Sequence, residues 1–351
     1  MKNQFYKSAA LMMLAMLLSA TTLWAEELGK QVNRSFNIRP DTKISVTNKF
    51  GNVIITKWNR NTLELKVDVK VNTKSESRSR RLLDAISIDI ADKIASGSLS
   101  IETLVEGNSN NSEFSIDYEI SMPDTNPLRL SNSFGNVYMG SYTGPLDADV
   151  RFGQFQAEDL NEANLHIEFS NSMCEVETLK KGQLELKYSK MTMDNIGEVV
   201  IDCQFSSLKV ARADKVRLDG KYGDIEFNTV TSLEGEVLFA GFKIGELVER
   251  LILETRHGNG ITIDKVSRTI KMIDIEGEFS TVDLGVESGT NTRLDFDLEF
   301  GNLKSYGEGI NFDKVIKDIN KSAYEGYLGS KSASSLIKVK TKHGNIRLEV
   351  E

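Results

Sequence analysis

Apolar and polar residues alternate along most of the chain in short runs, which is the period-two pattern of a β-strand with one buried face. Leu184 and Leu186 form one such run, and Leu294, Phe296 and Leu298 form another. One segment, from Ser75 to Asp84, instead predicts a short helix. The pattern therefore predicts an all-β protein.

The runs are punctuated by a repeated pair, an aromatic residue or histidine followed by a small residue. The small residue is Gly seven times, Ser four times and Ala once, and from Phe134 to Phe300 the spacing stays between 17 and 22 residues. The first members of the pairs, called anchors below, are Phe50, Phe134, Phe152, Phe169, Tyr188, Phe205, Tyr222, Phe239, His257, Phe279, Phe300 and His343. Such regularity indicates one structural unit repeated about twelve times.

Each anchor coincides with a shift in the alternation. Apolar residues follow the anchor at three and five positions, as Leu208 and Val210 follow Phe205. A one-residue shift would turn the buried side chains of a flat strand outward, so the shift predicts a bend, for which Gly or Ser supplies backbone freedom. We expect the anchor itself to face inward and its ring to stack on the rings of neighbouring repeats. On that basis Phe205→Ala costs about 3–5 kcal/mol.

Strand, bend, strand and turn within 17 to 22 residues fit one coil of a right-handed parallel β-helix, or β-solenoid, with about twelve short coils. The repeat is too short for a propeller blade of about 40 residues. It also lacks the regularly placed reversal signals of an antiparallel sandwich. Coils stacked about 4.8 Å apart would make a rod about 55 Å long.

Two segments interrupt the repeat and divide the chain. Residues 26–127 contain the first coil and a β-rich cap with the short helix, and residues 128–351 contain the solenoid. A cap of this kind covers the strand edges at the end of a solenoid. Within the second part, Gly307 to Ser335 is rich in Gly, Ser, Lys and Tyr and predicts a projecting loop insertion at about 307–335.

Residues 1–25 have the pattern of a cleaved secretory signal peptide. Lys2 and Lys7 precede an apolar run from Ala9 to Leu18, and small residues then lead to Ala25. The run is shorter than the ~20 apolar residues that span a bilayer, which favours cleavage over a retained anchor. We expect an exported protein that is periplasmic, on the cell surface or secreted, with no transmembrane segment in the mature chain.

Composition narrows the chemistry. The net charge of −8, from 43 Lys and Arg against 51 Asp and Glu, would repel phosphate backbones, so we expect no nucleic-acid partner. Three His and two Cys provide neither a multi-histidine metal site nor a disulfide scaffold. His257 and His343 fill anchor positions and His166 faces outward, so we expect no catalytic, cofactor-binding or metal site.

The two cysteines fall on inward positions on opposite sides of the bend, Cys174 five residues after Phe169 and Cys203 two before Phe205. They lie two coils apart, which amounts to about 9.6 Å along the axis. That distance exceeds the limit of about 7 Å between the Cα atoms of a disulfide. The sequence therefore predicts two buried free thiols.

One outward column carries an acid on seven consecutive coils, three residues before the anchor. Its members are Glu185, Asp202, Asp219, Glu236, Glu254, Glu276 and Asp297. The favoured interpretation is a solvated face, relieved by basic residues one position before the anchor such as Lys187, Lys221 and Arg256. The alternative interpretation is a binding stripe for divalent cations or a basic partner, since carboxylate oxygens suit Ca²⁺.

Several motifs resemble a known family. FGNV at 50–53 and again at 134–137, HGNI at 343–346, and the run from SRRLLDAISIDI through IDYEISMP are similar to the secreted bacterial putative adhesins of Bacteroidetes, which are related to the head GIN domain adhesins. The resemblance covers essentially the whole mature chain. It implies right-handed β-helix repeats and a non-enzymatic protein of the envelope or surface, and it carries over no catalytic residues.

These observations lead to one expectation and two alternatives. We expect an exported, non-enzymatic adhesin or cell-envelope module whose partner is a surface glycan or protein. The first alternative is a polysaccharide-active enzyme similar to the pectate lyases, which would need acids and an Arg or Lys converging in a groove. The second is a periplasmic regulatory scaffold.

Overall fold

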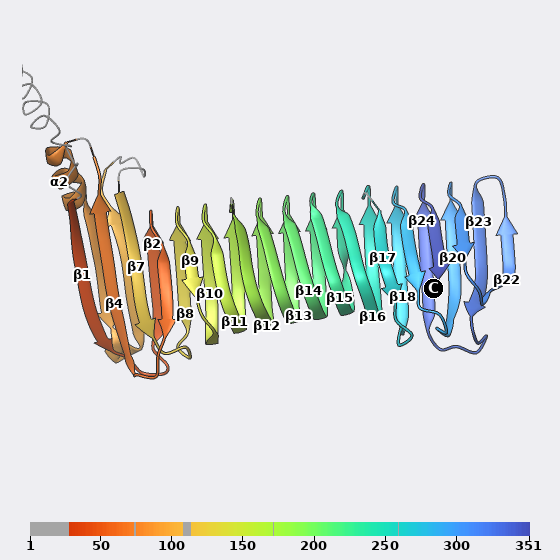
Figure 1. Cartoon of the computed structure of the whole chain (residues 1–351), viewed down its shortest axis with the longest axis horizontal. Coiled ribbons are helices and arrows are strands. Elements are labelled where there is room, and N and C mark those ends of the chain that lie inside the picture. The colour runs from red at the N-terminus through yellow and green to blue at the C-terminus, as the bar shows by residue number, and fades with distance from the viewer. Residues whose placement is uncertain (1–27, 74, 108–113, 171, 259) are drawn as a thin grey trace, which may run out of the picture.

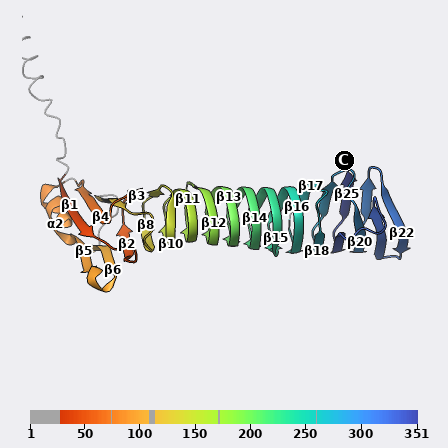
Figure 2. The same ribbon diagram turned by 90° about the horizontal axis from the view of Figure 1, so that it is seen from below.

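The computed structural model describes residues 28–73, 75–107, 114–170, 172–258 and 260–351, which form a long rod of stacked strands (Figure 1). The expected signal peptide at 1–25 lies outside the described residues. The 25 strands of the described residues belong to one sheet, and the view turned by 90° shows the middle of the rod as a row of flattened loops (Figure 2). The expectation of an all-β protein is confirmed.

In the middle of the rod, between residues 142 and 256, each strand pairs in parallel with the next strand of the sequence, and the shorter strands on either side pair in parallel with strands of the adjacent layers. The register Glu185↔Asp202↔Asp219 runs through three consecutive strands. We call an anchor and the two strand segments that flank it a layer. The strands of this part are β8 (Leu128–Ser133), β9 (Val137–Met139), β10 (Tyr142–Arg151), β11 (Phe155–Glu168), β12 (Met173–Lys187), β13 (Lys190–Gln204), β14 (Ser207–Lys221), β15 (Asp224–Leu238), β16 (Gly241–Arg256), β17 (Ile261–Val266), β18 (Met272–Glu278) and β19 (Val282–Val286).

At the N-terminal end the layer of Phe50 stacks directly on the layer of Phe134, and the intervening segment lies outside both. β6 and β7 pair in parallel with the strands of the Phe50 layer, and antiparallel strands cover them in turn. These elements are β1 (Leu28–Asn37), β2 (Lys43–Lys49), β3 (Val53–Lys57), β4 (Thr62–Val71), α2 (Glu76–Ala85), β5 (Ile86–Lys93), the 3₁₀ turn η1 (Ile94–Ser96), β6 (Ser98–Val105) and β7 (Phe114–Met122). Helix α2 confirms the predicted short helix. Among the described residues no helix has the length and apolar character to cross a bilayer.

At the other end the layers do not follow the order of the sequence. β24 pairs in parallel with β18 on one side and β20 on the other, so it lies between them (Figure 1). The segment expected as a projecting loop at 307–335 instead contains a β-hairpin, which pairs antiparallel with β20 and covers its edge. The elements are β20 (Thr292–Glu299), β21 (Leu303–Tyr306), β22 (Ile310–Lys317), β23 (Lys321–Leu328), β24 (Leu336–Lys342) and β25 (Ile346–Val350).

The predicted alternation is confirmed on both sides of the bend at Phe205, but the orientation of the anchors is wrong. Leu186, Leu208 and Val210 are buried as expected. Phe205, between them, is 48% exposed. The reason is its backbone: all twelve anchors have φ between 48° and 66°, the left-handed region, which swings the side chain outward and makes the next residue the inward one.

The small residue after the anchor is therefore required for space rather than for backbone freedom. Where it has a side chain, as in Ser189 and Ala240, that side chain is buried. A Cβ atom at Gly135 would lie 1.9 Å from the carbonyl oxygen of Gly51, and one at Gly223 would lie 1.9 Å from that of Ser206. The backbones of adjacent layers thus approach each other closely at this corner.

The two cysteines are free and buried, as predicted. Cys174 lies in the layer of Phe169 and Cys203 in the layer of Phe205. Burial raises the pKa of the Cys203 thiol to about 12 and also raises that of Cys174. Both groups are therefore protonated at neutral pH and inaccessible to solvent.

We predict that the native protein at about pH 8 does not react with a thiol reagent, because burial disfavours the reactive thiolate. After unfolding without reductant, both cysteines should react. Quantitative labelling checks this, and parallel samples treated with reductant provide the control. Fewer than two reactive thiols in the unfolded, unreduced protein would show that they are oxidised.

The corner constraint predicts that Gly135→Ala destabilises the protein by about 1–3 kcal/mol, because the new methyl group displaces a neighbouring backbone. Gly140→Ala is the matched control, since its Cβ would meet only the Glu158 side chain at 3.5 Å. Urea unfolding of both variants gives the comparison. Equal stability of the two would contradict the close approach at the corner.

Candidate binding surfaces

The twelve anchors form a continuous stack of rings along one edge of the rod, called the aromatic ridge below. Neighbouring ring centroids lie 4.7–5.3 Å apart with interplanar angles of 3–12°. The expected stacking between repeats is thus confirmed, although it takes place on the surface. In space His343 lies between Phe279 and Phe300, because β24 lies between β18 and β20.

The ridge offers ring edges rather than ring faces. Nine of its aromatic side chains are 37–49% exposed, while the faces of all but the terminal rings are covered by neighbours. At the N-terminal end the outer side of Phe50 is covered by Phe114 in an edge contact at 5.1 Å. A sugar ring stacks on an open aromatic face, so the interior of the ridge does not suit that mode of binding. It suits an apolar surface laid along the edges.

Polar side chains beside the ridge connect consecutive corners. The Oδ1 atoms of Asn52 and Asn136 accept hydrogen bonds of 2.9 Å from the backbone N–H groups of Asn136 and Gln154, one layer on. In the serine corners the Oγ of Ser189 accepts from the N–H of Ser170 at 3.0 Å, and that of Ser206 from Ser189 at 3.1 Å. These bonds pair N–H groups that the bend would otherwise leave unsatisfied.

The seven acids of the predicted stripe lie outward, but only six of them are consecutive in space. The register runs Glu185↔Asp202↔Asp219↔Glu236↔Glu254↔Glu276 and continues to Lys340, with Asp297 on the far side of that lysine. The uninterrupted column expected from the sequence is therefore wrong at its end, because β24 is inserted there. In the described residues no group of three or more His, Cys, Asp or Glu side chains is placed to hold a metal ion.

In the middle of the rod, basic and polar neighbours two residues along the strand contact the acids. Lys187 donates to Glu185, and Lys221 donates to Asp219 at 2.9 Å. His166 Nδ1 lies 2.8 Å from Glu185. The hydrogen bond from Lys187, with help from His166, lowers the pKa of the Glu185 carboxyl. This part of the column behaves as the solvated, charge-relieved face that the sequence favours.

The acidic column lies three residues before the anchors, and a second outward column lies one residue before them. The strip of surface between these two columns, called the lane below, opens into a groove near the C-terminal end. In the middle layers opposite charges such as Glu185 and Lys187 bridge the lane. Farther on, both side chains of a layer have the same sign: Glu276 and Glu278, Lys340 and Lys342, Asp297 and Glu299. No ion pair within 4.0 Å crosses the lane at these layers of the described chain, so it stays open.

The groove has a volume of about 740 Å³ and is closed at its end by the hairpin that follows β21. Glu254 and Arg256 line its beginning, and Ile316, Asp318 and Lys321 form its end wall. A smaller cavity of about 270 Å³ shares Asp318 and Lys321 with it and reaches the last ring of the ridge, Phe300. The sequence pattern did not identify this groove; the signal was the change from opposite-sign to same-sign pairs two residues apart.

The three histidines do not form a common site. His257 and His343 are rungs of the ridge, each between two phenylalanine rings. His166 lies on β11 beside Glu185. The packing role expected of the first two is the one they have.

No protein-family model matches this sequence, and no characterised protein matches it by sequence. Similar solved structures include a putative adhesin from Bacteroides fragilis (12% identity, TM-score 0.31, covering 91% of this chain and 97% of that one). Others are a putative adhesin from Parabacteroides merdae (10%, 0.30, 91% and 96%) and a putative cell adhesion protein from Clostridium sporogenes (12%, 0.22, 92% and 100%). At these TM-scores the chains do not superpose as wholes, so the likeness assigns neither fold nor function.

The ridge geometry changes the expected effect of Phe205→Ala. The substitution removes two surface ring contacts, worth about 0.5–1.5 kcal/mol each, and leaves the left-handed backbone in place. Phe205→Gly removes the same contacts but relieves about 1–2 kcal/mol of backbone strain. We predict that the Gly variant is the more stable of the two in urea unfolding, the reverse of their order in an ordinary strand. A more stable Ala variant would refute the strained corner.

Proposed function

We propose that the chain is a right-handed parallel β-solenoid exported to the cell envelope, where it acts as a non-enzymatic, adhesin-like binding module. Parallel pairing of successive strands supports the solenoid, and the motif resemblance given above supports the envelope role. Export rests on residues 1–25, with the mature chain beginning near Glu26. In this proposal residues 26–127 contribute the first coil and the cap, and residues 128–351 the solenoid.

The aromatic ridge is the observation that carries the binding function. Soluble monomers seldom expose a long contiguous apolar strip, and such strips usually mark interaction sites. Here Phe205, Tyr222 and Phe239 expose nearly half of their surface in consecutive layers. The ring faces are covered, so we propose that the partner is the apolar surface of a protein rather than a sugar ring.

A second function is favoured by the groove. A polysaccharide-active enzyme needs acids and a basic residue in one groove, and Glu254, Glu276 and Asp297 line this one together with Arg256 and Lys340. Incubation with acidic polysaccharides, with and without Ca²⁺, tests this alternative. New unsaturated chain ends that disappear in an Arg256→Gln variant would favour the enzyme over the binding module.

The main proposal predicts that the labelled protein binds intact cells or immobilised envelope proteins through its ridge. Replacing Phe205, Tyr222 and Phe239 together by Asn should weaken binding roughly tenfold or more, because Asn tolerates the left-handed backbone but offers no ring. Protease treatment of the target should abolish binding, whereas periodate oxidation of glycans should leave it intact.

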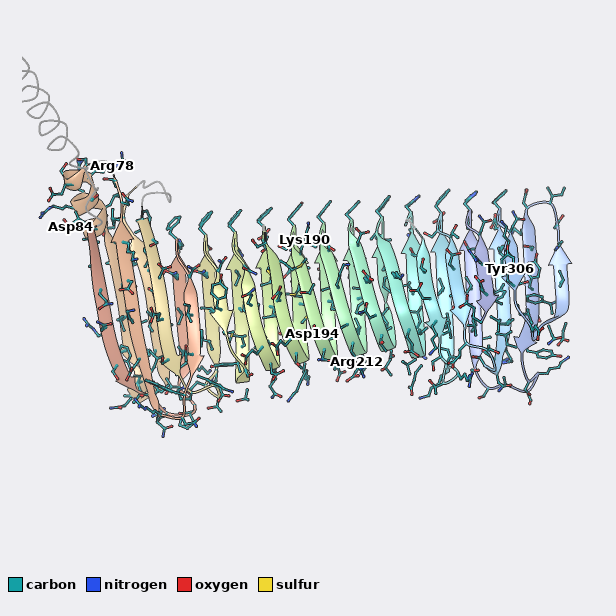
Figure 3. The ribbon with its side chains drawn as sticks, viewed as in Figure 1. Arg78, Asp84, Lys190, Asp194, Arg212 and Tyr306 are labelled. Atoms are coloured by element: carbon teal, nitrogen blue, oxygen red, sulfur yellow. The ribbon has the colours of Figure 1, made fainter. Side chains whose placement is uncertain are left out.

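The matched control changes three exposed residues away from the ridge, Asp194→Ala, Arg212→Ala and Asn228→Ala. Asp194 and Arg212 lie toward the lower margin of the rod in Figure 3, whereas Lys190, two residues after the anchor Tyr188, lies nearer its upper edge. Binding of this variant should match that of the unmodified protein. Equal loss in both variants would exclude the ridge as the contact surface, and absence of any binding would contradict the adhesin-like role.

A further inference from the structure

The position of β24 separates the order of strands in space from their order in the sequence. β20 follows β18 along the chain, with only β19 between them, yet β24 lies between β18 and β20 and pairs in parallel with both. β25 occupies the corresponding place on the other side of the corner, between β19 and β21. A whole layer from the end of the sequence is thus inserted into the stack.

The outward side chains of these three strands carry a charge pattern that matches the insertion. At the last three outward positions β24 carries only lysines, and β18 and β20 carry only acids; the first outward position holds Leu336, Met272 and Arg293, respectively. Each lysine lies between two acids: Lys338 between Asp274 and Asp295, Lys340 between Glu276 and Asp297, and Lys342 between Glu278 and Glu299. Lys338 Nζ lies 3.4 Å from Asp274 Oδ1.

The same pattern disfavours the arrangement that the sequence order would give. If β20 paired directly with β18, Asp295 would face Asp274, and two further acid pairs would follow along the strands. Like charges directly opposite each other destabilise a sheet, whereas opposite charges contribute about 0.2–1 kcal/mol per pair. Burial and the nearby Asp297 and Glu325 raise the pKa of Asp295, and Lys338 opposes that shift. Direct pairing of β20 with β18 is therefore disfavoured. The position between them, called the slot below, favours a strand that carries lysines.

The strand that fills the slot is joined to the rest of the chain by a short hinge. Seven residues, 329–335, link the end of β23 to the start of β24, and they can span about 24 Å when extended. Gly329 begins this segment with φ 65°. Hinge segments of this kind permit an identical element to be exchanged between two copies of a chain.

We propose that the slot between β18 and β20 is a charge-coded strand-acceptor site, and that β24 of a second copy of this chain can occupy it in place of the chain's own. Three lysines at alternate positions are the recognition feature. The chain's own strand has the advantage of tethering, so exchange links two rods only when the intramolecular fit is weakened or the protein is concentrated. This inference does not depend on the proposed binding function.

Two full-length variants test the charge code. One reverses the lysines (Lys338→Glu, Lys340→Glu, Lys342→Glu), and the other reverses the six acids of β18 and β20 to Lys. Each should unfold at a lower urea concentration than the unmodified protein, with a larger loss at about 20 mM than at about 500 mM salt. Combining both sets in one chain should recover at least half of the loss even if each variant alone folds poorly.

Mixing the two variants tests the exchange. The glutamate-bearing β24 of the lysine-reversed variant should enter the lysine-lined slot of the acid-reversed variant, and the lysine-bearing β24 of the acid-reversed variant should enter the acidic slot of the other. Equimolar mixtures should therefore form a two-chain complex, measured by light scattering after size exclusion. Lys57→Glu, Lys190→Glu and Lys304→Glu together are the control, with the same charge change at exposed positions outside the slot. This control should unfold like the unmodified protein and form no complex with either variant.

Three results would overturn the proposal. A lysine-reversed variant as stable as the unmodified protein would show that the three lysines are not what the slot recognises. A combined variant that recovers no stability would show that the charges act individually rather than in pairs across strands. Separate monomers in the mixture would show that the slot does not accept a strand from another copy.

Discussion

Each layer of the rod turns at one residue held in the left-handed region of backbone space, and the neighbouring layers hold it there. This conformation costs a non-glycine residue about 1–2 kcal/mol. A ring contact returns about 0.5–1.5 kcal/mol, and each interior anchor has one such contact per layer. The two terms nearly balance, so a corner is stable only as part of a stack. The small inward residue then allows the backbones to meet, and hydrogen bonds from Asn and Ser side chains complete the corner.

That balance explains what the sequence could and could not predict. The alternation before and after Phe205 predicted which side chains are buried, because the period of a strand is insensitive to the corner between its halves. The orientation of Phe205 itself was not predictable from the alternation. Its φ of 51° moves it from the inward to the outward side, and a bend with the anchor inward would have left the same apolar pattern on either side.

The order of the layers was less accessible still. The pair His343-Gly344 shows that His343 belongs to the repeat but not where its layer lies. The information was nevertheless present in the charges, since the alternate lysines of β24 complement the alternate acids of β18 and β20. The groove depends on the same choice. Residues of like sign within a layer, such as Lys340 and Lys342, form no ion pair with each other and leave the lane open, whereas Glu185 and Lys187 close it.

The corner also allows the layers to differ in length, because the extra residues lie elsewhere in the layer. Seventeen residues separate Phe205 from Tyr222, and twenty-two separate His257 from Phe279, yet the rings of both pairs stack at 4.7–4.8 Å. Much of the extra length lies in the turn at 267–271, between β17 and β18. A descendant of this chain could therefore gain, lose or enlarge a layer through duplication or insertion at such turns. Its reach would change while the two capped ends and the chemistry of each corner were inherited intact.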